Sequence, residues 1–182
     1  LATNIHDPLF ARAMVIEDGE ITLVMVIVDN VDVAPSGFKK ARERIQQEFN
    51  IPGSNIVISA THTHTGPAYS EAYEKILAVK IHDAVKIAMQ KLQQAVIKDG
   101  IGKEANISFH RRFMMKDGTV KFNPGALNPD IVKPMGPIDP DVGILYLETT
   151  DGKPIAVMVN FAMHLDTVGG TEMSADYPYF MG

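Results

Sequence analysis

The stretch Ile56–Pro67, IVISATHTHTGP, runs from an apolar segment through two histidines into a Gly-Pro turn. Its first five residues, Ile56–Ala60, predict a short and mostly buried strand. His62 and His64 follow, two residues apart and flanked by threonines. Because successive side chains of an extended chain alternate between its two faces, this spacing predicts that both imidazoles point the same way as Ile58. We therefore expect the two rings to address one centre at the end of the strand.

Hydrophobic periodicity in the rest of the chain predicts both strands and helices. Runs of β-branched residues separated by Asp-Gly turns predict antiparallel pairs, and apolar residues at helical spacing predict two amphipathic helices. Ser36 is expected to cap the first helix, and Lys98–Gly100 to stop the second. The expected strands cover residues 10–16, 21–28, 56–60, 106–112, 143–148 and 155–161, the expected helices cover 36–49 and 71–96, and a proline-rich loop covers 123–140. This order predicts one α/β domain over residues 1–182, a layered mixed β-sheet flanked by helices.

Composition excludes several classes of function. With 46% hydrophobic residues among 182, the chain can build a sizeable core. Its formal net charge of -5 gives no electrostatic basis for binding nucleic acid. No apolar stretch approaches the roughly 20 residues that a membrane-spanning helix needs. The chain has no cysteine, so a metal site would have to use histidine, carboxylate or tyrosine ligands.

Three of the expected strands end in polar groups suited to chemistry. Asp29 and Asp32 follow one strand, the two neighbouring histidines follow the next, and His164 and Asp166 follow the last. In open α/β sheets, ligands bind beyond the carboxyl ends of strands, because side chains from several strands meet there. The pattern predicts one shared site, in which Asp166 or another carboxylate orients an imidazole.

The histidine ribbon, Ser59–Pro67, matches what a zinc site needs. An HxH pair at a strand end supplies neutral nitrogen ligands to zinc, and the turn behind it leaves the centre open. The flanking threonines can offer hydroxyls to the groups around the metal. The alternative is a polar loop without a metal, and His164 counts against it by adding an imidazole after a buried strand. No role is expected for His6 or for His82, which is predicted to face solvent.

A basic triplet, His110-Arg111-Arg112, ends the strand expected at 106–112 beside the long loop. By strand parity the two arginines point in opposite directions. One of them is expected to bind substrate and the other to lie on the surface.

Five segments of the chain together form a recognisable pattern. They are SATHTHTGP from Ser59, NFAMH from Asn160, SADYP from Ser174, HDPLFAR from His6 and GPIDPD from Gly136. With the arginine pair, they resemble the N-terminal catalytic domain of the neutral/alkaline non-lysosomal ceramidases. The pairing of the histidine ribbon with the second histidine segment is far more specific than an HxH pattern alone.

The resemblance implies a zinc amidohydrolase that cleaves the N-acyl bond of ceramide to sphingosine and a fatty acid through zinc-activated water. It implies that His62 and His164 bind Zn²⁺, and that His64 and Arg111 line the active site, although Arg112 stays an alternative to Arg111. It also implies a Glu and a Tyr ligand beyond Gly182, so we expect the chain to be either part of a longer catalytic domain or a natural short form with an incomplete site. Tyr177 is a weaker candidate for a substitute ligand. A ceramide-like lipid is the expected partner, and a secreted or periplasmic location is compatible with it.

Two other functions stay open at this point. A related zinc hydrolase could act on a different amide or ester, because fold and metal ligands do not determine the acyl group. A noncatalytic binding module is the second alternative, because two histidines leave zinc short of the three protein ligands that catalytic sites commonly have.

Overall fold

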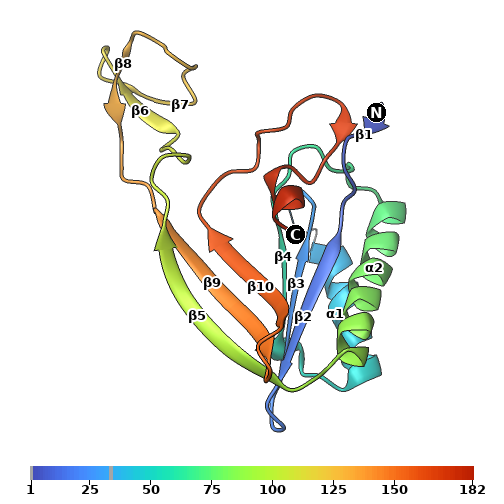
Figure 1. The fold of residues 1–182 in the computed structure, drawn as a ribbon. Coiled ribbons are helices and arrows are strands. Elements are labelled where there is room, and N and C mark those ends of the chain that lie inside the picture. Colours follow the sequence, from blue (N-terminus) through green and yellow to red (C-terminus); the bar gives the residue numbers. More distant parts are fainter. Residues whose placement is uncertain (1, 33–34) are drawn as a thin grey trace. The chain divides into compact units, whose positions relative to one another are not determined.

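The computed structural model describes residues 2–32 and 35–182. Within it the chain divides into two compact units (Figure 1). The first unit combines Leu1–Gln93 with Leu165–Gly182, and the second is Gln94–His164. The α/β class is confirmed, since several sheets occur together with two α-helices. A single domain over residues 1–182 stays a prediction, because this division does not show which parts fold independently.

The first unit is built on a mixed three-stranded sheet in the order β2-β3-β4. β2 (Ala11–Glu17) and β3 (Thr22–Val28) form the predicted antiparallel hairpin. The tip of this hairpin is closed by Asp18, whose carboxylate accepts hydrogen bonds from two backbone N–H groups. β4 (Ile56–Ala60) then pairs in parallel with β3. The parallel pairing brings the carboxyl ends of β3 and β4 to the same edge of the sheet.

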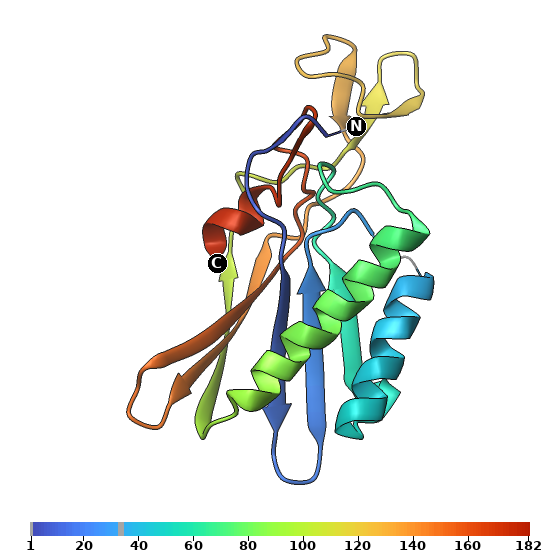
Figure 2. The same ribbon diagram turned by 90° about the vertical axis from the view of Figure 1, so that its right-hand side faces the viewer.

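Both α-helices, α1 (Pro35–Phe49) and α2 (Glu71–Gln90), cover one face of this sheet (Figure 2). Ser70 caps α2 by accepting a hydrogen bond from the backbone N–H of Tyr73. The apolar stripes of the two helices and the inward faces of β3 and β4 form the core. Its buried members are Val24, Val26, Val28, Phe38, Ala41, Ile45, Ile51, Ile56, Ile58, Leu77, Ala78, Ile81 and Val85.

The two ends of the chain meet within the first unit. β1 (Asn4–Ile5) pairs in parallel with β11 (Glu172–Met173), so a segment near the start lies beside one near the end. Two 3-10 helices complete the unit, at Gly53–Asn55 and at Tyr177–Met181.

The second unit contains two antiparallel three-stranded sheets. One has the order β10-β9-β5 and the other the order β7-β6-β8. Their strands are β5 (Ala95–Lys103), β6 (Arg112–Met115), β7 (Val120–Phe122), β8 (Ile131–Pro134), β9 (Asp141–Thr149) and β10 (Pro154–Phe161). The hairpin of β9 and β10 confirms the pair that the sequence predicts around Asp151-Gly152.

Several predicted boundaries beyond residue 90 are wrong. The helix expected to reach residue 96 ends at Gln90, and the expected stop at Lys98–Gly100 lies inside β5. All nine residues of β5 pair with β9, so a long-range ladder overrides the local helical pattern. The strand expected at 106–112 does not form, β6 begins at Arg112, and the predicted loop at 123–140 contains β8.

Two side chains of the helix pair also differ from their predictions. His82 is buried, because α1 packs beside α2 and places Glu48 2.7 Å from the His82 Nε2. Its ring also stacks on Phe49, with centroids 5.8 Å apart. Ser36 does not cap α1 but lies inside the helix, where its hydroxyl donates to Glu74.

Among the described residues, no helix has both the length and the apolar character needed to cross a membrane.

Truncating one core residue tests this packing. Ile81→Ala on α2 removes a side chain that is fully buried, and we expect it to lower the free energy of unfolding by about 2–5 kcal/mol. Ile76→Ala is the matched control on the same helix, because Ile76 is 57% exposed and its truncation is expected to cost less than about 1 kcal/mol. Equilibrium denaturation in urea measures both values, and equal losses would contradict the assignment of the core.

Candidate metal centre

The candidate site lies at the carboxyl ends of β3 and β4. The last residues of the two strands, Val28 and Ala60, are register partners. Beyond them the strands stay tied together, because the backbone N–H of His62 donates to the carbonyl of Asn30 over 2.9 Å. Asn30 is itself buried, and its side-chain amide donates to the hydroxyl of Tyr69. The start of the histidine ribbon is therefore held on a rigid base.

The histidine ribbon is not a simple extension of β4. Up to Ala60 the even-numbered residues face the core, whereas beyond it Thr63 and Thr65 are buried and the two histidines are exposed. His62 has a φ of 72°, in the left-handed region, and this backbone change shifts the inward-facing phase by one residue. The prediction that the histidines point the same way as Ile58 is therefore wrong.

The two imidazoles of the ribbon nevertheless lie together. Their ring centroids are 4.8 Å apart, and the two Nε2 atoms are separated by 3.2 Å. Two nitrogen ligands of one tetrahedral zinc, each about 2.0–2.1 Å from the metal, are about 3.4 Å apart. The two Nε2 atoms are thus close enough to face the same metal ion, whether or not both bind it.

A backbone carbonyl determines the tautomer of His62. Its Nδ1 lies 2.5 Å from the carbonyl oxygen of Val31, which can only accept a hydrogen bond, so Nδ1 carries the proton. In that tautomer the lone pair is on Nε2, the atom that faces His64. In metal-binding histidines, the N–H of the ring nitrogen that does not bind the metal commonly donates a hydrogen bond to a carbonyl in this way.

His164 stands where the chain returns to the first unit. It is the last residue of the second unit, and its neighbour Leu165 is buried in the first. Among the described residues, one group of three histidine or acidic side chains has the geometry to hold a metal ion, and it consists of His62, His64 and His164. Their candidate ligand atoms lie within 4.8 Å of one another. The donor set therefore fits a metal that prefers imidazole, such as zinc.

The carboxylates that follow β3 and β10 have different environments. Asp166 is exposed, and its Oδ1 lies 4.0 Å from the Nδ1 of His64. Asp29, in contrast, is buried and forms an ion pair with Arg12 at 2.8 Å. The ion pair of Asp29 with Arg12 thus links the start of β2 to the end of β3. Asp32 is exposed, and its backbone carbonyl accepts the hydroxyl hydrogen bond of Tyr69.

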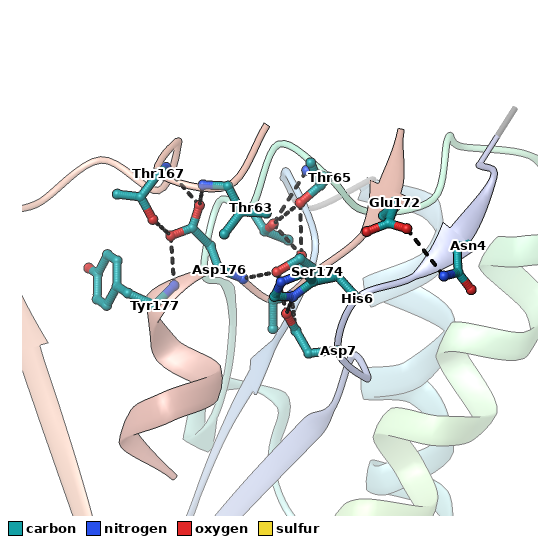
Figure 3. A network of polar contacts seen from close by, with 12 residues as sticks. Asn4, His6, Asp7, Thr63, Thr65, Thr167, Glu172, Ser174, Asp176 and Tyr177 are labelled. Atoms are coloured by element: carbon teal, nitrogen blue, oxygen red, sulfur yellow. Dashed lines mark hydrogen bonds and ion pairs between the residues drawn. The ribbon is translucent and has the colours of Figure 1, made fainter. Parts of the chain in front are cut away.

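Asp176 is fully buried, and hydrogen-bond donors surround its carboxylate (Figure 3). Its carboxylate accepts from the backbone N–H groups of Thr167, Val168 and Tyr177, and also from the Thr167 hydroxyl. Burial alone would raise the pKa of Asp176, but these hydrogen bonds outweigh it and hold the pKa below its ordinary value of 3.8. The group is therefore an anion that fixes the turn following Asp166.

A second buried carboxylate, Asp7, lies in the same network. The Ser174 hydroxyl donates to its Oδ2, the Ala175 N–H to its Oδ1 at 2.6 Å, and His6 Nδ1 to its Oδ2 at 2.8 Å. Burial would again raise the pKa of Asp7, and the bonds from Ser174, Ala175 and His6 lower it below 3.8. The carbonyl of Ser174 accepts the hydroxyl hydrogen bonds of Thr63 and Thr65. The hydroxyls of these two threonines thus donate to a backbone carbonyl. The prediction that they bond to groups around a metal is therefore wrong.

The remaining sequence candidates are weaker. Arg111 belongs to the second unit, where its guanidinium carbon lies 4.8 Å from the ring centroid of Phe122, and Arg112 there is exposed. Burial, and next to it the charge of Asp176, raises the pKa of Tyr177, which disfavours the phenolate that a metal would bind. The role predicted for Arg111 stays a prediction.

Comparison with solved structures identifies the fold. A ceramidase complexed with C2 aligns with a TM-score of 0.78 at 24% sequence identity. The neutral ceramidase of Pseudomonas aeruginosa aligns with a TM-score of 0.72 at 21% identity. The chain has a ceramidase-like fold. The resemblance read from the sequence motifs is thus confirmed at the level of structure.

The two alignments cover nearly all of this chain but only a small part of the solved structures. Each covers 95% of this chain but only 29% of the solved structure, so the chain spans less than a third of those enzymes. A search against protein-family models gave no match. At these identities the ceramidase-like fold is established, whereas activity has to be argued from the site itself.

Sequence reasoning did not assign roles to Asp7, Ser174 and Asp176. No local pattern distinguishes an aspartate that accepts several backbone N–H groups from one in an ordinary turn. The only signal was that all three lie within the short segments HDPLFAR and SADYP, which support the resemblance.

The buried carboxylate of Asp176 predicts a pH dependence of stability. A carboxyl whose pKa is lowered by folding stabilises the folded state above its unfolded pKa, near 3.8, and loses that contribution as the pH falls through the lowered folded pKa. We expect Asp176→Asn to lower the free energy of unfolding at pH 7 by about 2 kcal/mol. We also expect it to flatten the dependence below about pH 5. Urea denaturation between pH 7 and pH 2 measures this, and parallel curves for the two proteins would contradict it.

Proposed function

We propose that the chain is part of a zinc-dependent hydrolase that cleaves the N-acyl linkage of a ceramide-like lipid, releasing sphingosine and a fatty acid. The observation that carries the proposal is the group of three histidines at the strand ends of a ceramidase-like fold. Two solved ceramidases with this fold support the substrate class.

In this proposal His62 and His164 hold the zinc, together with ligands from the rest of the full-length chain. When bound, zinc polarises the amide carbonyl and lowers the pKa of a water toward about 7, so that a nucleophile is available at neutral pH. His62 is prepared for this role, because its hydrogen bond to Val31 leaves the lone pair on Nε2. Its unusual φ aims the ring away from the buried threonines.

His64 is the proposed proton carrier. Amide hydrolysis breaks the C–N bond, and the leaving sphingosine amine has to gain a proton. The Nε2 of His64 faces the candidate metal site, whereas its Nδ1 faces Asp166. A carboxylate on the far side of an imidazole orients the ring and stabilises its protonated form. His64 can therefore hold a proton at Nε2 and donate it to the amine nitrogen.

Arg111 is the proposed partner of the developing negative charge on the amide oxygen. A permanently charged guanidinium suits this task, and removal of such a donor typically costs on the order of 10²–10³ in rate. This assignment rests on the sequence resemblance. Replacing Arg111 and Arg112 separately with Lys in the full-length protein decides between them, because the larger loss of kcat identifies the active-site arginine.

Separate replacement of the three histidines tests the roles. In the full-length protein, His62→Ala and His164→Ala are expected to lose stoichiometric zinc and ceramide hydrolysis together. His64→Ala is expected to retain zinc but to lose about 10²–10⁴ in kcat, because it removes proton transfer alone. Zinc is measured by elemental analysis and hydrolysis by release of fatty acid.

A control and two contrary outcomes complete this test. His82→Gln, which removes an imidazole from the helix pair, is expected to keep both zinc and turnover. Undiminished zinc in both His62→Ala and His164→Ala would overturn the ligand assignment, whereas zinc loss in His64→Ala would make His64 a ligand.

A substrate panel tests which leaving group the enzyme prefers. The full-length protein is expected to hydrolyse N-acylsphingosines faster than N-acyl amino acids or acyl esters of similar chain length. Faster turnover of an ester would favour the related hydrolase of another substrate. Absence of both zinc and turnover would favour the binding module.

A further inference from the structure

We propose that Asp7 and Asp176 are positioning residues that hold the histidine ribbon and the Asp166 turn in one geometry, and thereby set the metal affinity of the site. The inference rests on the proposed function and names residues to which no role has been assigned. Ser174 links the two residues, because its hydroxyl donates to the Asp7 carboxylate and accepts a hydrogen bond from the backbone N–H of Asp176 (Figure 3).

Asp176 determines the position of the segment that follows His164. Each of its two oxygens accepts two hydrogen bonds, and three of the four donors lie on Thr167 and Val168. Thr167 follows Asp166, the residue 4.0 Å from His64. A shift of this turn would therefore move Asp166 and, through two further peptide bonds, His164.

Asp7 and Ser174 determine the position of the histidine ribbon. Asp7 anchors Ser174 by accepting its hydroxyl hydrogen bond and the adjacent Ala175 N–H. The Ser174 carbonyl in turn accepts the hydroxyls of Thr63 at 2.6 Å and Thr65 at 3.1 Å. The Ser174 N–H also donates to the carbonyl of Thr65. Thr63 lies between the two histidines, and its buried hydrogen bond to Ser174 keeps both imidazoles on the exposed side.

The backbone shows that this network constrains the chain. Asp176 has a φ of 61° and a ψ of -156°, a conformation that side-chain-bearing residues rarely adopt. Such a conformation persists only when surrounding interactions determine it, and it commonly occurs at functional sites. Here the interactions are the Asp176 N–H, which donates to the Ser174 hydroxyl, and the four hydrogen bonds to its carboxylate.

A purely structural role does not account for the arrangement. Neither carboxylate belongs to the hydrophobic core between the sheet and the helices. The donors that Asp176 binds outside its own segment, Thr167 and Val168, are loop residues three and four positions after His164, a proposed ligand. In metal sites, removal of such supporting groups typically weakens metal affinity by 10–100-fold.

The test measures zinc affinity in the full-length protein by competition with a chromophoric chelator. Asp176→Asn and Ser174→Ala are each expected to weaken zinc binding by about 10–100-fold. The control is Asp18→Asn, which removes a turn-capping carboxylate at the opposite end of β3 and is expected to leave the affinity unchanged. Unchanged zinc affinity in both network variants, each with a cooperative unfolding transition in thermal melting, would overturn the inference.

Hydrogen exchange separates this inference from the proposed function. In the zinc-free protein, Asp176→Asn is expected to accelerate exchange of the Thr167 and Val168 amides, and Asp7→Asn is expected to accelerate that of Ser174 and Ala175. If the wild-type protein binds no zinc, the proposed function fails, while accelerated exchange would still support the positioning network. If zinc binds and neither exchange nor affinity changes, the positioning role fails alone.

Discussion

The parallel pairing of β3 with β4 is the constraint on which the candidate site depends. Two parallel strands end at the same edge of a sheet, so the segments that follow Val28 and Ala60 have to leave side by side. The hydrogen bond from His62 to Asn30 extends this pairing beyond the strands. The helix pair on one face of the sheet buries β3 and β4, which makes this edge rigid.

A single residue in the left-handed region converts this strand end into a site. Had the ribbon continued as a strand, its histidines would have followed Ile58 and Ala60 toward the core. The backbone at His62 shifts the phase, so that the threonines are buried against Ser174 and the imidazoles are exposed. Burial of polar threonine hydroxyls is tolerated because each finds an acceptor. The Nε2 atoms of the two exposed imidazoles are then 3.2 Å apart.

The buried carboxylates join segments that are distant in the chain. Asp7 comes from the start of the chain, whereas Ser174 and Asp176 come from near its end. A buried carboxylate is stable only when donors surround it, and here backbone N–H groups supply most of them. The same bonds that stabilise the charges also fix the loops around the histidines.

The sequence alone determined the elements whose signals are local. Turn chemistry predicts the hairpin at Asp18-Gly19, and the hydrophobic pattern predicts the strand at Ile56–Ala60. The histidine pair follows directly from the sequence after that strand. The remaining features depend on contacts between residues far apart in the chain, so local signals could not predict them. β5 became a strand because β9 pairs with it, and His82 was buried because α1 packs beside it. The anchoring of Thr63 and Thr65 by Ser174 likewise depends on hydrogen bonds across more than a hundred residues, which no local pattern encodes.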